Sequence, residues 1–175
     1  MKIKCSLAPS SIDAAIKQLE DYSKDLDRKA QELCERLANY GFQVIFTNLS
    51  QHIYSGETIS NLQVQEINPN KYVILDGSVA LLLLEFGSGL KAVGHPLAGE
   101  MNMGPGTYPE QTHALDPNGW WFETNDPNLA VYTSKKTGKS YGHSYGSSPQ
   151  MPFYNGAKDM RKEIFNIARE VFENH

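Results

Sequence analysis

The longest regular feature of the sequence is an apolar stripe near the N-terminus, which a helix would gather on one side. Apolar residues recur there at intervals of three and four, the spacing of one helical face: Ile12, Ala15, Ile16, Leu19, Leu26, Ala30, Leu33 and Leu37. The stripe predicts a helix that ends near Tyr40, followed by Gly41 in the left-handed position that often follows a helix. At about 1.5 Å per residue this helix would be roughly 45 Å long, which exceeds the width of a compact domain. We therefore expect either a break within the charged segment 20–28 or one projecting end.

A second helix is predicted near the other end of the chain. Pro152 suits the first helical turn, where a missing N–H costs nothing. Apolar residues recur there at intervals of three and four, and charged residues occupy the other face. The apolar positions are Phe153, Ala157, Met160, Ile164, Ile167 and Val171. This pattern predicts a helix running to Phe172, with one face on the core.

The middle of the chain is typical of β-structure. Segment 42–49 is rich in β-branched and aromatic residues, and segment 62–65 alternates apolar and polar side chains. Segments 71–76 and 79–86 flank Asp76-Gly77-Ser78, which predicts a hairpin. The uninterrupted apolar run at the start of the second segment predicts a central strand of the sheet.

Further along, residues 120–122 resume β-like sequence, and segments 130–134 and 140–145 predict another hairpin. Glycine and proline are frequent from 88 to 118, where no strand or helix period survives. Loops of this length are usually functional or disordered. Strands and helices do not alternate as βαβ units, so we expect an α+β fold. Its mainly antiparallel sheet would be packed by the N-terminal and C-terminal helices, in a single domain 1–175 with 88–118 as a long flexible loop.

Composition narrows the function classes. A chain of 175 residues with 40% hydrophobic residues can bury one core. The 16 basic and 20 acidic residues give a net charge of −4, which argues against sequence-specific nucleic-acid binding. No apolar stretch reaches the length of a membrane span, so we expect no membrane partner. Cys5 and Cys34 lack metal-binding or redox spacing, and free thiols are expected.

One motif suggests catalysis. Gly142-His143-Ser144-Tyr145-Gly146 fits the G-x-S-x-G pattern of serine hydrolases, which also need an acidic residue and then a histidine downstream. The downstream histidine is His175, which is at the end of the sequence and hard to hold in place. His95, His113 and His143, with Asp116 or Glu123, lack the spacing of a metal site. We expect no catalytic residue, no metal and no cofactor, and keep a small cytosolic serine hydrolase as the alternative.

Aromatic and apolar residues suggest contact with a partner. Trp120 and Trp121 are adjacent in a predicted strand, so their side chains point to opposite faces. One can fill the core, while the other faces solvent, the long loop or a partner. Leu90, Met101 and Met103 are the corresponding interface candidates in the loop. A monomeric binding module that uses Trp120 or Trp121 is a further alternative.

Two short stretches carry a family resemblance. The first is residues 84–89, Leu84-Glu85-Phe86-Gly87-Ser88-Gly89, and the second is residues 151–164, which begin Met151-Pro152-Phe153-Tyr154-Asn155-Gly156-Ala157-Lys158. Together with the order of helix, strands, variable loop, aromatic strand and closing helix, they resemble a family of minor tail components of long-tailed bacteriophages. Members of that family are α+β proteins that complete the tail or join it to the head.

The resemblance implies a structural role for this chain in a phage or prophage tail, without an active site. It implies partners of two kinds: other copies of the chain in a ring, commonly of six subunits, and other tail or connector proteins. The chain would be made in the cytoplasm of the bacterial host and end in the tail or neck of the virion. The positions matching the family are expected to be architectural: Phe86, Gly87, Gly89, Pro152, Phe153 and Ala157.

Overall fold

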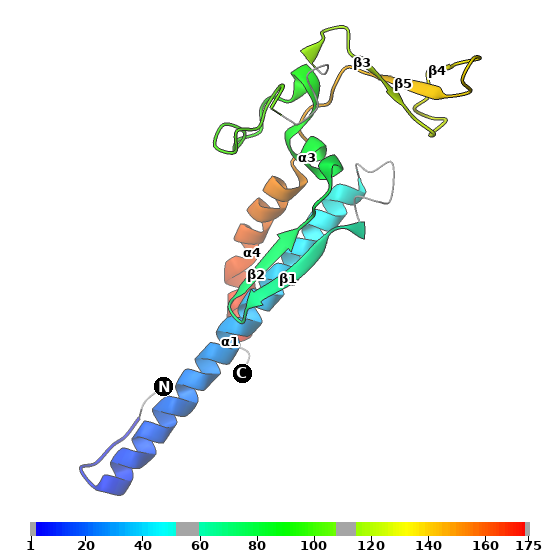
Figure 1. Cartoon of the computed structure of the whole chain (residues 1–175). Coiled ribbons are helices and arrows are strands. Elements are labelled where there is room, and N and C mark those ends of the chain that lie inside the picture. Colours follow the sequence, from blue (N-terminus) through cyan, green and yellow to red (C-terminus); the bar gives the residue numbers. More distant parts are fainter. Residues whose placement is uncertain (1–2, 52–59, 108–114, 174–175) are drawn as a thin grey trace. The chain divides into compact units, whose positions relative to one another are not determined.

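The computed structural model of the chain describes residues 3–51, 60–107 and 115–173. It has the predicted α+β class, with long helices near both ends of the chain and two small antiparallel sheets (Figure 1). In order, the elements are α1 (Pro9–Ser50), β1 (Gln63–Asn68), β2 (Lys71–Leu75), α3 (Val79–Phe86), the 3₁₀ helix η1 (Gly89–Lys91), β3 (Trp120–Glu123), β4 (Tyr132–Thr133), β5 (Ser140–Ser144) and α4 (Pro152–Glu173).

The chain divides into two compact units, each built from separate stretches. Unit 1 comprises Met1–Val44, Gln63–Leu75 and Lys158–His175, and unit 2 comprises Ile45–Leu62 and Asp76–Ala157. Helices α1 and α4 therefore contribute residues to both units. The single domain 1–175 stays a prediction.

Helix α1 is longer than predicted and has no break. It runs for 42 residues, through the charged segment 20–28 and through segment 42–49, which we had predicted to be a strand. The strand prediction is wrong because a helix, once formed, extends at little cost, and tertiary packing outweighs the weak β propensity. Ile45 and Leu49 lie one turn apart and are buried, so segment 42–49 has an apolar face with helical spacing.

Gly41 does not end the helix. It is buried within α1, and a Cβ there would lie 3.0 Å from Ile74 Cδ1 and 3.0 Å from Met160 Sδ. The residue therefore allows β2 and α4 to pack closely on α1 inside unit 1. The glycine that we interpreted as the end of the helix is therefore explained by close packing.

The first part of the α1 stripe is uncovered. Ile12, Ile16, Leu19 and Leu26 are 41%, 49%, 55% and 38% exposed, respectively. Our expectation that this stripe packs on the sheet is wrong for these positions, whereas Leu33, further along, is half-buried. The projecting end, which was the other expectation for so long a helix, agrees with this exposure.

Strands β1 and β2 form an antiparallel hairpin through Asn68-Pro69-Asn70, residue types that favour a turn. The predicted hairpin between 71–76 and 79–86 is wrong, because Val79–Phe86 is the helix α3. Ser78 caps this helix by accepting a hydrogen bond from the Leu81 N–H, at 3.2 Å. In a short run where almost every residue is apolar, the spacing of apolar residues cannot distinguish a strand from a helix. Leucine and alanine, which dominate this run, are strong helix formers.

Strands β3, β4 and β5 and helix α4 follow the prediction, whereas the 3₁₀ helix η1 lies in the segment that was predicted to be a loop. Strands β3, β5 and β4 form one antiparallel sheet in that order, and β4 and β5 are the arms of the second predicted hairpin. Helix α4 begins at Pro152, which is fully buried, and its stripe ends at Val171, which is also fully buried. The rest of the α4 stripe is half-buried.

Candidate functional site

The N-terminus of α4 has no capping side chain of its own. Met151, which precedes Pro152, accepts the first helical hydrogen bond from Asn155 N–H at 2.9 Å, and it has φ 59°. Its thioether cannot cap the free N–H groups of the first turn as a serine or aspartate would. The acceptor must therefore come from another part of the chain.

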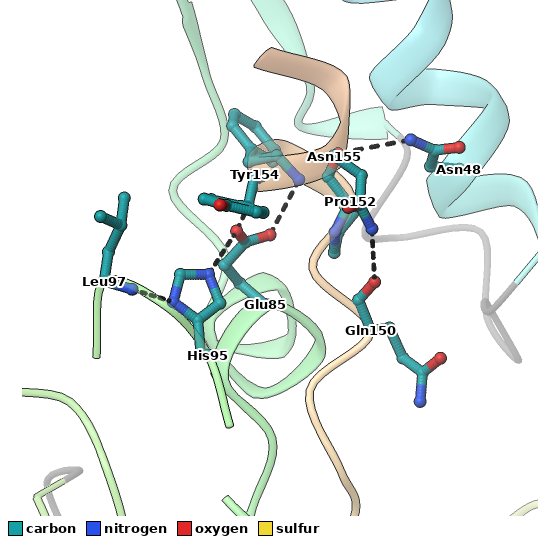
Figure 2. Close-up of polar contacts among 9 residues, drawn as sticks. Asn48, Glu85, His95, Leu97, Gln150, Pro152, Tyr154 and Asn155 are labelled. Carbon is teal, nitrogen blue, oxygen red and sulfur yellow. Dashed lines mark hydrogen bonds and ion pairs between the residues drawn. The ribbon is translucent and has the colours of Figure 1, made fainter. Parts of the chain in front are cut away.

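Glu85, in the last turn of α3, supplies this acceptor (Figure 2). Its Oε2 accepts from Phe153 N–H at 2.8 Å, and its Oε1 accepts from Tyr154 N–H at 2.9 Å. These are the second and third helical positions, which a capping side chain normally serves. The carboxylate also faces the positive end of the helix dipole, which favours its negative charge. We call Glu85, His95, Phe153 and Tyr154 the Glu85 junction.

His95 completes the junction. Its Nε2 lies 3.0 Å from Glu85 Oε1, and its Nδ1 accepts from Leu97 N–H at 3.1 Å (Figure 2). Because Nδ1 is an acceptor, the proton of the neutral ring is on Nε2, which donates to Glu85. His95 is 6% exposed, and its ring lies against Phe86, at 4.3 Å between ring centroids, and edge-on to Tyr154, at 5.5 Å. His95 therefore fastens the start of the predicted flexible loop to α3.

A second set of contacts joins the end of α3 to the segment that precedes α4. Ser88 and Ser147 form an isolated antiparallel bridge, with backbone hydrogen bonds of 2.8 and 3.1 Å, and their hydroxyls are 3.0 Å apart. The carbonyl of Leu84 accepts from the N–H of Gln150 at 2.8 Å. Backbone groups at the end of α3 are thus satisfied by residues 147–151, which lead into α4, and N–H groups in the first turn of α4 are satisfied by the Glu85 side chain.

The two stretches that carry the family resemblance are therefore in contact, and their contacts are structural. Both oxygens of Glu85 are occupied by donors of the chain itself, so the junction does not present a free acid or base. Of the expected architectural positions, Phe86 and Pro152 are buried, Phe153 donates to Glu85, and Ala157 is half-buried. Gly87 and Gly89 are buried, with φ of 82° and 63°.

Sequence reasoning missed the roles of Glu85, His95 and Ser147. A proline-initiated helix without a preceding Ser, Thr, Asp or Asn was a usable signal, because it predicts a capping acceptor from elsewhere. Nothing in the sequence showed which residue that would be.

The second feature of unit 2 is a row of aromatic side chains on the β3–β5–β4 sheet. Cross-strand pairing places Trp121 opposite His143 and Tyr132 opposite Tyr141, so these four share one face. We call them, with Tyr145, the aromatic face. Ring centroids of His143 lie 4.6 Å from Trp121 and 4.7 Å from Tyr145. Trp121, Tyr132 and Tyr145 are 57%, 56% and 60% exposed, which leaves a large aromatic surface in water.

One ion pair lies on the same face. Lys139 Nζ donates to Glu123 Oε2 at 2.7 Å, and this hydrogen bond raises the pKa of the lysine. Both side chains are more than half exposed, so the pair adds little stability. The Lys139–Glu123 pair therefore places two charged side chains beside the aromatic face.

The predicted interface residues fall in two groups. Trp121, Leu90 and Met101 are exposed, at 57%, 47% and 53%. Trp120 is half-buried on the opposite face of β3, and Met103 packs against the buried pair Phe86 and Ala92. Within the predicted loop 88–118, the described residues therefore include packed positions as well as exposed ones, and its flexibility stays a prediction.

The hydrolase motif does not form a nucleophile elbow. Ser144 is the last residue of β5, its Oγ accepts from Gly146 N–H at 3.1 Å, and the chain reaches α4 at Pro152. An elbow places the serine on a sharp turn directly between strand and helix. His175 and His113 lie outside the described residues. Among the residues that are described, no three His, Cys, Asp or Glu side chains gather as metal ligands would.

Comparison with protein-family models, curated proteins and solved structures finds no match to this chain. Of the helices in the described ranges, none combines the length and apolar character needed to cross a membrane.

Proposed function

We propose that the chain is a structural component of a bacteriophage or prophage tail. It acts at the head–tail joint or in tail completion, through contacts with copies of itself, in a ring, and with other tail or connector proteins. It works in the bacterial cytoplasm during assembly and in the virion tail or neck afterwards.

One observation carries this proposal. The two stretches that resemble the tail-component family, 84–89 and 151–164, meet in the Glu85 junction, although Glu85 and Phe153 are 68 positions apart in the sequence. In a structural protein, shared motifs are expected to hold the fold together, and here they do so through hydrogen bonds rather than a free catalytic group. The exposed aromatic and apolar side chains then give the chain surfaces that assembly can bury.

The aromatic face also favours a second candidate, a binding module that stacks a ligand on Trp121 and its neighbours. Exposed aromatic rings suit protein interfaces, sugars and nucleobases alike. Residues 115–145, which contain the β3–β5–β4 sheet, carry three lysines, Lys135, Lys136 and Lys139, and three acidic residues, Asp116, Glu123 and Asp126. This segment therefore has no excess positive charge for a phosphate backbone. A binding module would act as a monomer and would not be needed to build a tail.

The test is complementation in the phage or prophage that encodes the chain. Deleting the gene should leave unjoined heads and tails in electron micrographs, and the wild-type gene supplied in trans should restore joined particles. Ser144→Ala should restore them equally well, because the change keeps the backbone pairing of Ser144 with Trp120 and removes only the acceptor of the local hydrogen bond from Gly146 N–H. If Ser144→Ala folds but fails to restore particles, and a serine-directed phosphonate labels the wild type at this residue, the hydrolase is right. Normal particles without the gene would reject the tail role.

A further inference from the structure

The uncovered stripe of α1 has the spacing of a coiled coil. From Ile12 onward, the steps between stripe positions alternate between four and three residues: Ile12, Ile16, Leu19, Ser23, Leu26, Ala30, Leu33 and Leu37. In heptad terms, Ile16 and Ser23 are at a positions and Ile12, Leu19 and Leu26 are at d positions. A sustained 3.5-residue spacing keeps the stripe facing a partner helix when two helices wind around each other.

The seam is available in the part of the chain that the structure describes. Its first half, Ile12 to Leu26, which we call the α1 seam, is exposed at every one of these a and d positions. In this part of α1 the ion pairs stay within the helix, from Arg28 to Asp25 and Glu32, and from Lys29 to Asp25. At the start of α1, the Ser11 hydroxyl accepts a hydrogen bond from Ser6 N–H of the preceding segment, at 2.9 Å. Contacts of α1 with the β1–β2 hairpin and with α4 occur further along, at Cys34 with Asn70 and at Arg36 with Glu170.

The residues that flank the seam are different on its two sides. The e positions are acidic, Asp13, Glu20 and Asp27, whereas the g positions beside them are Ala15 and Tyr22. In a parallel pair, g faces e of the partner, so Ala15 would face Glu20 of the second copy and Tyr22 would face Asp27. In an antiparallel pair, e faces e, which sets acid against acid. The charges therefore favour a parallel arrangement.

We propose that the α1 seam is a self-association surface, on which a second copy of this chain packs in parallel. The same residues that leave a single copy with exposed isoleucine and leucine would be buried against identical residues of the second copy. Copies related by rotation about a common axis have their helices parallel near that axis, so the arrangement is compatible with a ring. The inference does not rest on the proposed tail function, because the spacing, exposure and flanking charges carry it.

The first experiment measures the mass of the full chain in solution by sedimentation over a dilution series. The wild type should associate, and Leu19→Asp with Leu26→Asp should be monomeric at every concentration. Gln18→Asp with Gln31→Asp is the matched control: it adds the same two charges at exposed positions off the seam and should still associate. Because Leu19 and Leu26 are exposed in one copy, circular dichroism of the double variant should remain that of a folded protein.

The second experiment tests direction. With Cys5 and Cys34 changed to serine, Leu19→Cys and Leu26→Cys, each tested alone, should form covalent dimers under mild oxidation, because equivalent d positions meet in a parallel pair. Gln18→Cys should not. Wild type that is monomeric at the highest soluble concentration overturns the proposal. An associated wild type also overturns it if the seam variants associate equally, or if neither seam cysteine cross-links.

Discussion

Glu85→Ala should destabilise unit 2 strongly, since it removes the only side-chain acceptor at the start of α4 among the described residues. The N–H groups of Phe153 and Tyr154 and the Nε2–H of His95 would lose their acceptor at a position where Glu85 is 8% exposed. Leaving a buried donor unsatisfied costs about 1–3 kcal/mol, so three of them should cost about 3 kcal/mol or more. For a chain of this size, that corresponds to a melting temperature lowered by roughly 6–12 °C.

Thermal unfolding followed by circular dichroism measures this effect. Glu85→Gln keeps one carbonyl oxygen and should fall between wild type and Glu85→Ala. Glu123→Ala is the matched control, because it also removes a carboxylate with a hydrogen bond, but from an exposed ion pair. Its cost should stay below about 1 kcal/mol. Equal melting temperatures for Glu85→Ala and Glu123→Ala would show that the junction does not hold α4.

Gly87→Ala should be nearly as damaging, for a reason of shape. Gly87 has φ 82° and ψ −175°, a backbone conformation that is close to exclusive to glycine. A Cβ would lie 2.5 Å from the Ser147 carbonyl oxygen and 2.9 Å from Pro149 Cδ. The strained backbone of alanine at this position should cost about 1–3 kcal/mol. The clash with Ser147 should also displace the Ser88–Ser147 bridge, which adds to this cost. We expect a total loss of more than about 3 kcal/mol.

Gly94→Ala separates the two causes. Gly94 also has positive φ, at 95°, but a Cβ there would meet no atom within 4 Å. It should therefore cost only the left-handed strain, roughly 1–2 kcal/mol. Denaturant unfolding of both variants gives the comparison. If the two glycine variants lose the same stability, the close approach at Gly87 is not important for the fold.

The parts of the fold that could be predicted are those with local signals. The α4 helix has a proline at its start and a complete apolar stripe, and the β1–β2 turn has Asn-Pro-Asn, so each was visible within a few neighbouring residues. Helix α3 was mistaken for a strand because its apolar residues show no period. Segment 42–49 was mistaken because its β propensity is a weaker influence than continuation of α1 and burial of Ile45 and Leu49.

The candidate site was harder to predict, because its contacts are not local. The alternation in the 120–122 segment correctly indicated that Trp120 and Trp121 face opposite ways. That Glu85 would cap a helix 68 residues later, or that His95 would fasten the loop to it, depends on how distant segments come together. A single sequence gives no information on such pairs, although the missing cap before Pro152 shows that some partner is required.

The Ser88–Ser147 bridge has a consequence for how this chain can change length. The 58 residues between these serines form a long excursion of the chain whose two ends are held together by the bridge. Near the start of this excursion, the hydrogen bond of His95 with Glu85 holds the chain to α3 a second time. Closing a longer flexible loop costs little, about 0.6 kcal/mol for each doubling. Insertions at surface turns between Met103 and Ser147 should therefore leave the contacts between α3 and α4 intact. The exposed turn at 135–139 is the natural place to carry a fluorescent or affinity tag, with which the chain could be located inside a larger particle.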